Sequence, residues 1–148
     1  MEDEFKIEVE LLVDGKLPFK AHKTDAGFDL FATREIYIAQ GQIIKHPLNI
    51  KMKLPKGTYA QITSKSGLGS KGLLVFAGII DESYRGIPHV VCTNLNSDNN
   101  GLIKIEKDQK LAQLIMHSYN SNYYMVEVES ISDDTVRGSS GFGSSGIF

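Results

Sequence analysis

Residues 64–72 (SKSGLGSKG) combine three features that suit a phosphate ligand. Their small side chains let successive backbone N–H groups approach an anion, their hydroxyl groups add donors, and Lys65 adds positive charge. The same composition is typical of a polar loop between two strands, and for this stretch alone the loop is the commoner case. The segment is therefore a candidate phosphate-binding loop that needs support from elsewhere in the chain.

A second candidate, residues 77–86 (AGIIDESYRG), places one carboxylate at the end of a short apolar run. A strand that ends in Asp81 can hold a general base rigidly, and an aromatic residue and a glycine follow it. The alternative is an ordinary hairpin in which Asp81 makes a hydrogen bond within the turn. The residue types alone do not decide between the two.

The end of the chain, residues 137–146 (RGSSGFGSSG), is rich in glycine and serine. Most segments of this composition are flexible tails. Arg137 is a bidentate phosphate donor, however, and Phe142 offers a flat face to a nucleobase. An inert linker needs neither side chain, so both count against a plain tail.

Two further segments hold isolated polar residues. Residues 25–30 (DAGFDL) set Asp29 close to a glycine turn, where a carboxylate more often stabilises the turn than binds a metal. Residues 110–115 (KLAQLI) are mostly apolar with Gln113 as their only amide, which is typical of a buried strand. The histidines and Cys92 show no metal-ligand spacing, so we expect no zinc site.

The elements that must position these residues are predicted to be strands, because apolar and polar residues alternate along most of the chain. Proline and glycine clusters separate the alternating runs as turns do. Short strands at this spacing predict an all-β sandwich, barrel or jelly roll. Only residues 66–71 and 108–114 could hold a helical turn. The expected strands cover residues 5–13, 36–38, 43–44, 50–54, 59–63, 73–80, 89–95, 102–105, 111–117 and 125–128.

Composition limits the class of partner. The 148 residues suit one domain, and the net charge of -2 argues against duplex nucleic acid as the main partner while allowing a small polyanion. The single cysteine excludes an intrachain disulfide, and the acidic N-terminus does not look like a secretory signal. The longest apolar run is far shorter than the roughly 20 residues that cross a bilayer. We expect a soluble intracellular protein with no stable nucleic-acid partner and no membrane contact.

In their order and spacing, these segments resemble the five motifs of the trimeric dUTPase family. The matching positions are residues 26–30, 65–68, 77–86, 109–115 and 137–146, so the resemblance covers most of the chain. It implies a jelly-roll-like β domain over residues 1–136 and a homotrimer with active sites at subunit interfaces. It also implies that residues 137–148 form a flexible glycine-rich arm that closes over the active site.

The resemblance assigns roles to individual residues. Asp81 is similar to the base that activates water at the α-phosphorus, and Asp29 to the acid that holds the water shell of Mg2+. Tyr84 resembles the residue that lies under deoxyribose and excludes a 2′-hydroxyl, while main-chain groups of its hairpin would pair with uracil. The implied substrate-binding residues are Lys65, Ser66, Gly67, Ala77, Gly78, Tyr84, Gln113, Arg137, Phe142, Gly143, Ser144 and Ser145.

The implied reaction is the Mg2+-dependent hydrolysis of dUTP to dUMP and pyrophosphate, which limits uracil incorporation into DNA and supplies dUMP for dTMP synthesis. Lys65 departs from the arginine of most members and gives up its bidentate fork, and Ser145 replaces a commoner threonine. The Lys-Ser pair and the Gly-Ile-Phe ending are most similar to retroviral, lentivirus-type members. A retroviral origin would make the protein virion-associated.

Two alternatives stay open at this point. A dCTP deaminase shares the fold but needs a glutamate on the strand after the Asp81 hairpin, where this chain has Val91, so we do not expect deamination. A nucleotide-sensing or partner-binding trimer of the same fold would have only weak catalysis. A module that only bound partners would not require Asp81, Tyr84, Arg137 and Phe142 together.

Overall fold

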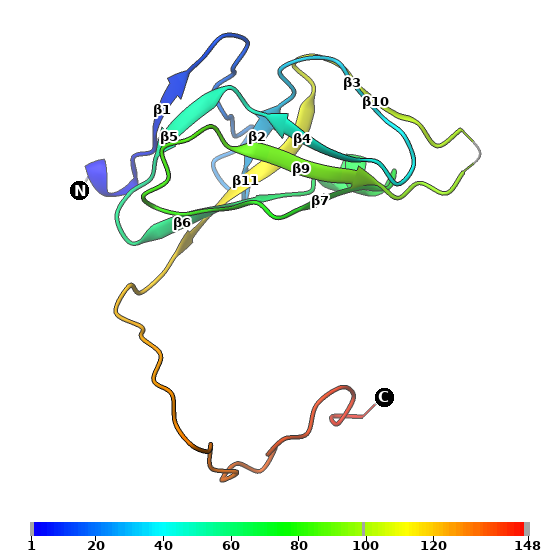
Figure 1. The fold of residues 1–148 in the computed structure, drawn as a ribbon. Coiled ribbons are helices and arrows are strands. Elements are labelled where there is room, and N and C mark those ends of the chain that lie inside the picture. Colours follow the sequence, from blue (N-terminus) through cyan, green and yellow to red (C-terminus); the bar gives the residue numbers. More distant parts are fainter. Residues whose placement is uncertain (1, 99, 147–148) are drawn as a thin grey trace.

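Nearly all of the regular structure is β, as the alternating pattern predicts (Figure 1). The computed structural model describes residues 2–98 and 100–146. Besides strands it contains a 3-10 helix, η1 (Glu2–Phe5), and one short helix, α1 (Ser66–Gly69). The strands are β1 (Glu8–Leu11), β2 (Phe28–Phe31), β3 (Ile36–Ile38), β4 (Ile43–Pro47), β5 (Ile50–Lys53), β6 (Thr58–Thr63), β7 (Leu73–Phe76), β8 (Ile79–Ile80), β9 (His89–Asn94), β10 (Ile103–Ile105) and β11 (Lys110–Ser118).

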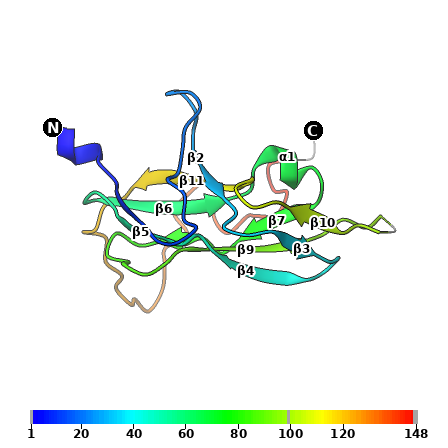
Figure 2. The ribbon, with the colours of Figure 1, turned by 90° about the horizontal axis from the view of Figure 1, so that it is seen from above.

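Two antiparallel sheets form opposite layers of a jelly-roll-like body. One sheet has the strand order β2-β11-β6-β8 and the other β4-β9-β7, while β1-β5 and β10-β3 form two-stranded ribbons. Seen from above, β6 and β11 lie on one side of the body, with β9 and β4 on the other (Figure 2). The four motif segments within residues 26–115 therefore lie on or beside strands that are far apart in sequence but belong to one body.

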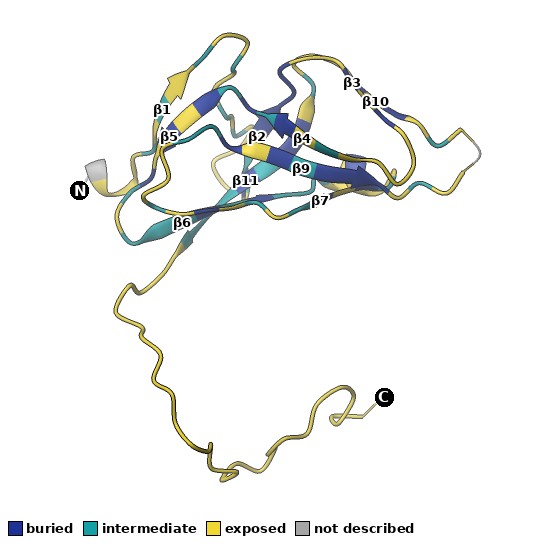
Figure 3. Ribbon diagram, viewed as in Figure 1, coloured by how far each residue is buried: buried dark blue, intermediate teal, exposed yellow. Residues whose placement is uncertain are grey.

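The core lies between the layers, and buried and exposed residues alternate along β3, β5 and β10 (Figure 3). Leu30, Ile38, Ile50, Ile105 and Leu114 are almost completely buried. Burial of a side chain of this size stabilises the fold by about 1.5–3 kcal/mol. Leu30 and Leu114 flank Asp29 and Gln113 in the sequence, so the core fixes the strands from which these two polar side chains project.

The predicted strand over residues 73–80 is wrong in one respect, because it is two strands in two different sheets. Ala77 and Gly78 have φ values of 58° and 91°, which interrupt the extended conformation. Strand β7 pairs with β9, and β8 pairs with β6 in the other layer. The apolar run is continuous because both strands face the same core, which hides the break from a periodicity argument.

Two other predictions near the site are also corrected. Residues 28–31 form β2, a strand that the sequence reading does not predict because the segment is only four residues long and carries a buried aspartate. Residues 108–114 form no helical turn, since β11 begins at Lys110 and pairs with both β2 and β6. The helical turn expected within residues 66–71 is confirmed as α1.

After β11 the chain leaves the body. Every residue from Ser118 to Gly146 is exposed, and the segment runs away from both sheets (Figure 1). The strand predicted at residues 125–128 is not formed, and no strand of the described residues pairs with this segment. Within the described residues, no helix is long and apolar enough to cross a membrane.

Candidate active site

Asp29 is held between two lysines on β2, an edge strand of the four-stranded sheet. Lys65 Nζ donates a hydrogen bond to Oδ1 of Asp29, and Lys110 Nζ lies 2.9 Å from Oδ2. Burial raises the pKa of the Asp29 carboxyl, but the hydrogen bonds and charges of both lysines outweigh burial, so the pKa is lowered below its usual value. The cluster of Asp29, Lys65 and Lys110 therefore combines one carboxylate with two lysine ammonium groups.

Gln113 connects this cluster to the candidate phosphate loop. It lies opposite Asp29 on β2 and opposite Thr63 on β6, and its Nε2 donates to the carbonyl oxygen of Ser64 at 2.9 Å. Gly27 makes the arrangement possible, since a Cβ at that position would lie 2.8 Å from Oε1 of Gln113. The register of three neighbouring strands thus brings the first, second and fourth motifs together.

Ser66 and Gly67 begin α1, directly after Lys65. Both residues are exposed, and a Cβ built at Gly67 would meet no atom within 4 Å, so the start of the helix opens on solvent. Ser64 lies behind them, where its hydroxyl accepts a hydrogen bond from Val75 N at 3.0 Å. The loop is anchored from behind and leaves its front free for a ligand.

The third motif begins in an unusual backbone conformation. Gly78 O accepts a hydrogen bond from Ile62 N at 2.8 Å, and a Cβ at Gly78 would lie 2.5 Å from Ile62 O. A larger residue at position 78 would therefore clash with β6 as well as strain the backbone. Ala77 and Gly78 together set the direction of β8 and of the carboxylate that follows it.

Asp81 directly follows β8 and is exposed. Its carbonyl oxygen accepts a hydrogen bond from Tyr84 N at 3.0 Å, which closes the turn, and Tyr84 Oη donates to Ile87 O at 3.2 Å. Gly86 lies against the tyrosine ring, because a Cβ there would be 2.4 Å from Oη. The turn holds the Tyr84 ring in place and leaves the Asp81 carboxylate on the surface.

Asp81 and Gln113 lie at opposite ends of β6. Thr63, at one end of the strand, pairs with Gln113, whereas Ala60, near the other end, pairs with Ile80, the residue before Asp81. Strand residues are about 3.3 Å apart along the chain, so the two functional groups are separated by roughly 10 Å or more within one chain. Asp29, Lys65, Ser66, Gly67 and Gln113 are therefore gathered in one place, and Asp81 is not among them.

The C-terminal candidates lie apart from both groups. Arg137 bonds only within its own turn among the described contacts, with Nε donating to Ser140 O at 3.0 Å, and Phe142 is fully exposed. Gly143, Ser144 and Ser145 belong to the same exposed stretch, and Gly146 N bonds back to Gly143 O at 3.0 Å. A single chain does not bring this segment to the rest of the motifs.

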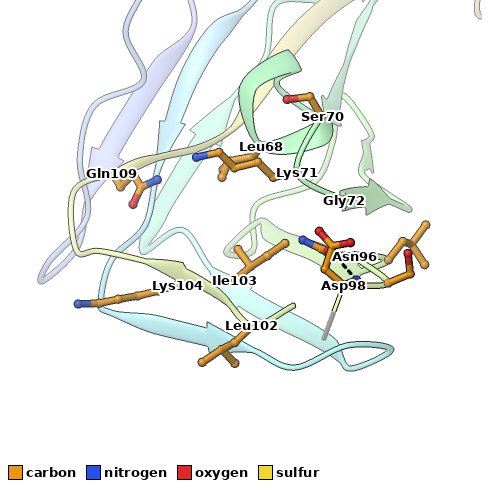
Figure 4. Close-up of a pocket in the computed structure, with 12 residues that line it drawn as sticks. Leu68, Ser70, Lys71, Gly72, Asn96, Asp98, Leu102, Ile103, Lys104 and Gln109 are labelled. Atoms are coloured by element: carbon orange, nitrogen blue, oxygen red, sulfur yellow. Dashed lines mark hydrogen bonds between the residues drawn. The ribbon is translucent and has the colours of Figure 1, made fainter. Parts of the chain in front are cut away.

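Two hollows border these groups. One of about 570 Å³ is lined by Asp81, with Tyr59 and Tyr119 among its walls. Another of about 630 Å³ lies on the far side of α1, between Lys71 and Lys104 (Figure 4). The second hollow contains none of the predicted site residues, so volume alone does not mark the site.

Lys110, Glu82 and Tyr119 belong to the region of the site but were not predicted from the sequence. Lys110 lies in the fourth motif, and its charge next to Gln113 was the available signal. Glu82 follows Asp81 directly, and its carboxylate bonds Tyr119 Oη at 3.0 Å. No sequence pattern connects these last two residues, since their contact depends on how β6, β8 and β11 pair.

The residues fit a metal that arrives with its ligand better than a metal held by a protein cage. Among the described residues, no group of three or more His, Cys, Asp or Glu side chains could hold a metal ion. Asp29 remains anionic, and a carboxylate has more lone pairs than its two lysine contacts use. Mg2+ commonly keeps several waters and is bound through phosphates plus one or two carboxylates. Asp29 can therefore accept hydrogen bonds from the metal's waters.

Similar proteins agree with the motifs. The deoxyuridine 5'-triphosphate nucleotidohydrolase of Clostridium novyi (strain NT) is 38% identical over 136 residues, which cover 88% of this chain and 91% of that protein. The Pol polyprotein of Equine infectious anemia virus (strain Wyoming) is 36% identical over 143 residues, or 97% of this chain, but the chain spans only 12% of the polyprotein's length. The solved Staphylococcus bacteriophage 80alpha dUTPase with dUPNHPP has a TM-score of 0.88 at 27% identity, covering 96% of this chain and 99% of that one.

The similarity extends over nearly the whole chain. A family model for dUTPase matches residues 14–146, which include all five motifs and leave only the two ends of the sequence outside the match. The similarity to a lentiviral polyprotein is consistent with the retroviral character of the Lys-Ser pair and the C-terminal ending. The chain therefore belongs to the dUTPase family, as the order and spacing of its motifs predict.

Proposed function

We propose that this chain hydrolyses dUTP to dUMP and pyrophosphate. The observation that carries the proposal is the cluster of Asp29, Lys65 and Lys110 beside the open start of α1. Its net positive charge and its exposed backbone and hydroxyl donors suit a chain of phosphates. Because the chain belongs to the dUTPase family, we take dUTP to be the nucleotide that carries those phosphates.

Asp81 is the proposed general base. It takes a proton from a water molecule while the water oxygen bonds to the α-phosphorus. The bond from that phosphorus to the oxygen bridging to the β-phosphate then breaks, and pyrophosphate leaves with the bridging oxygen. A positioned base contributes about 10²–10⁴-fold, and charge stabilisation by Lys65, Ser66 and Gln113 supplies further rate enhancement.

The proposed active site is shared between copies in a homotrimer. The distance along β6 between the Gln113 end and the Asp81 end supports this, because a base that acts through one water molecule must lie close to the phosphate that Gln113 and Ser66 bind. A symmetric ring of copies places the hairpin of one chain against the phosphate loop of the next. The exposed position of Arg137 and Phe142 supports the same arrangement for the arm.

Mg2+ is the proposed cofactor: Asp29 would hold it through water, and when bound it would neutralise part of the phosphate charge. This chain supplies the remaining positive charge through Lys65, Lys110 and Arg137. An anionic attacking group is repelled by a triphosphate of about four negative charges, so these side chains are needed before Asp81 is effective.

Selection of the base and the sugar is assigned to the Asp81 hairpin. The backbone of Ala77 and Gly78 offers donors and acceptors to the uracil edge, and the Tyr84 ring excludes a 2′-hydroxyl by contact. The hydrogen bond from Tyr84 Oη to Ile87 O supports this role, since it restrains the ring. The arm of residues 137–148 would then close over the nucleotide, with Arg137 on the γ-phosphate, Phe142 on uracil, and Gly143, Ser144 and Ser145 over the phosphates.

An assay of three nucleotides tests the proposal. The chain is incubated with Mg2+ and dUTP, UTP or dCTP, and pyrophosphate and ammonia are both followed. We expect pyrophosphate from dUTP, little from UTP and dCTP, and no ammonia. Ammonia from dCTP would indicate a deaminase, although Val91 lies in β9 where it cannot transfer a proton. Binding of dUTP without product would indicate a nucleotide-sensing trimer.

A further inference from the structure

Glu82 follows Asp81 directly, yet its side chain is bound to two distant segments. Its Oε2 accepts hydrogen bonds from Gly57 N at 2.9 Å and from Tyr119 Oη at 3.0 Å. Gly57 lies in the turn before β6, and Tyr119 is the first residue after β11. The Gly57 bond, followed by the Tyr119 bond, lowers the pKa of the Glu82 carboxyl, so the group is anionic at neutral pH.

Backbone hydrogen bonds tie the same three segments together. Tyr119 N donates to Gly57 O at 2.9 Å, so Gly57 is bound on one side by Glu82 and on the other by Tyr119. Arg85 donates to the carbonyl oxygens of Glu82 and Tyr84 at 2.8 and 3.0 Å. The turn that carries Asp81 is therefore fastened both to the start of β6 and to the end of β11.

The strand that leads into this turn is short, and just before it Gly78 O accepts a hydrogen bond from Ile62 N of β6. Strand β8 consists of Ile79 and Ile80 alone, and these two residues make its only register pairs with β6. Asp81, Glu82 and Tyr119 line one hollow, so a change at Glu82 acts on the wall that also carries the proposed base. Because a displacement of about 1 Å can cost up to about 10²-fold in rate, a weakly paired hairpin needs such a fastening.

We propose that Glu82 is a positioning residue for dUTP hydrolysis, which fixes the Asp81 turn on the frame of β6 and β11. The same contact connects Asp81 to the root of the C-terminal segment, because Tyr119 is the residue at which the chain leaves the body. The inference rests on the proposed function, in which Asp81 is the base. Glu82 itself touches no reacting atom in this account.

Four variants and one control test the positioning role in the assembled protein, with dUTP and Mg2+ as substrate. Glu82→Ala removes the acceptor, and Glu82→Gln removes the charge but keeps an oxygen that can accept both bonds. Tyr119→Phe removes one donor, and Glu82→Ala/Tyr119→Phe tests whether the two residues act through one contact. Glu106→Ala is the matched control, since Glu106 is an exposed carboxylate that forms only a 3.7 Å ion pair with Lys104.

We expect Glu82→Ala to lower kcat about 10-fold with KM changed by no more than about 3-fold. Glu82→Gln should recover most of the lost rate, Tyr119→Phe should lose about 3-fold, and the double variant should be no slower than Glu82→Ala. The control should match the parent, and all variants should keep the parental assembly and Tm. A residue with a purely structural role would lower Tm and the folded fraction without this split between kcat and KM.

Several results would overturn the proposal. They are a kcat for Glu82→Ala within about 2-fold of the parent, a Glu82→Gln variant as slow as Glu82→Ala, or additive losses in the double variant. If Glu82→Ala fails to assemble, an unchanged kcat in Tyr119→Phe overturns it instead. Asp81→Asn distinguishes failure of the proposed base from failure of the positioning role. Normal turnover in Asp81→Asn would overturn both proposals. An inactive Asp81→Asn together with a fully active Glu82→Ala would overturn only the positioning role of Glu82.

Discussion

Lys65 shows how one residue can differ from the family pattern while the site keeps its charge. Most members have arginine at this position, and a lysine cannot make the bidentate contact of a guanidinium. Here the ammonium groups of Lys65 and Lys110 contact different oxygens of Asp29. Two separate cations thus contact one carboxylate, and they provide the positive charge beside the solvent-exposed start of α1.

Asp81→Asn should abolish most of the chemistry and leave binding intact. The amide keeps the size of the carboxylate but cannot accept a proton, so we expect kcat to fall by about 10²–10⁴-fold. Affinity for a non-hydrolysable dUTP analogue, measured by calorimetry, should stay within about 3-fold of the parent. Asp98→Asn, at an exposed position away from the site, serves as the control. Near-parental turnover in Asp81→Asn would remove this residue from the role of base.

His46 predicts how stability depends on pH. The side chain is completely buried, its Nε2 accepts a hydrogen bond from Thr33 N at 2.9 Å, and its Nδ1 has no partner among the described contacts. Burial first, and then the charges of Arg34 and His89, lower its pKa from 6.5 to about 4. Below pH 6.5 His46 is protonated in the unfolded chain but stays neutral in the folded chain. Folding therefore becomes less favourable as the pH falls towards 4.

The expected change in the free energy of unfolding is a loss of about 3 kcal/mol between pH 7 and pH 4 from this group. Denaturant titrations at pH 7, 6, 5 and 4 measure it. Glutamine at position 46 does not titrate, so the stability of His46→Gln should decline less steeply with falling pH than that of the parent. Parallel curves for the two proteins over the whole range would show that His46 is not the cause.

At the scale of elements, most strands are predictable because their alternation reflects a core on one side. Residues 36–38, 50–54, 59–63 and 89–95 correspond closely to β3, β5, β6 and β9. Two of the exceptions are places where the site overrides the pattern. Ala77 and Gly78 break an apolar run with positive φ values, and β2 carries the buried Asp29 that its lysine partners stabilise.

The motifs predict which residues take part in the site but not how they contact one another. Spacing in the sequence places Lys65 and Gln113 in the site, yet their link through Asp29 and Ser64 depends on the order β2-β11-β6. The contact between Glu82 and Tyr119 joins positions 37 residues apart and has no local signal. Pairing of strands that are distant in sequence is a property of the whole fold, so local patterns do not contain it.

The arm should be required for turnover and not for folding. Residues 137–146 are exposed, and the ribbon runs away from both sheets (Figure 3). Deletion of residues 137–148 should therefore leave the free energy of unfolding within about 0.5 kcal/mol of the parent and leave the assembly unchanged. Without Arg137 and Phe142, we expect kcat to fall by at least about 10-fold. Steady-state kinetics and denaturant titration of the truncated chain measure both, and normal turnover would refute a closing arm.

At the scale of the whole molecule, a single chain leaves too much apolar surface uncovered after β11. Tyr123, Tyr124, Met125 and Val136 are all more than four-fifths exposed, with values of 85%, 85%, 103% and 112%. Large exposed apolar surface is one mark of an interaction site, so we expect a neighbouring copy of the proposed trimer to cover this segment. The same segment connects the body to Arg137. A neighbouring copy that covers this segment would therefore also determine which active site the arm reaches.

Mixed trimers built from two inactive variants test that arrangement most directly. Asp81→Asn and the chain without residues 137–148 are co-expressed with different affinity tags, and trimers that contain both are isolated by tandem purification. If the base and the arm of one site come from different copies, each mixed trimer has one intact site, and about a third of the parental kcat per trimer returns. Mixed trimers no more active than the two variants alone would contradict a shared active site.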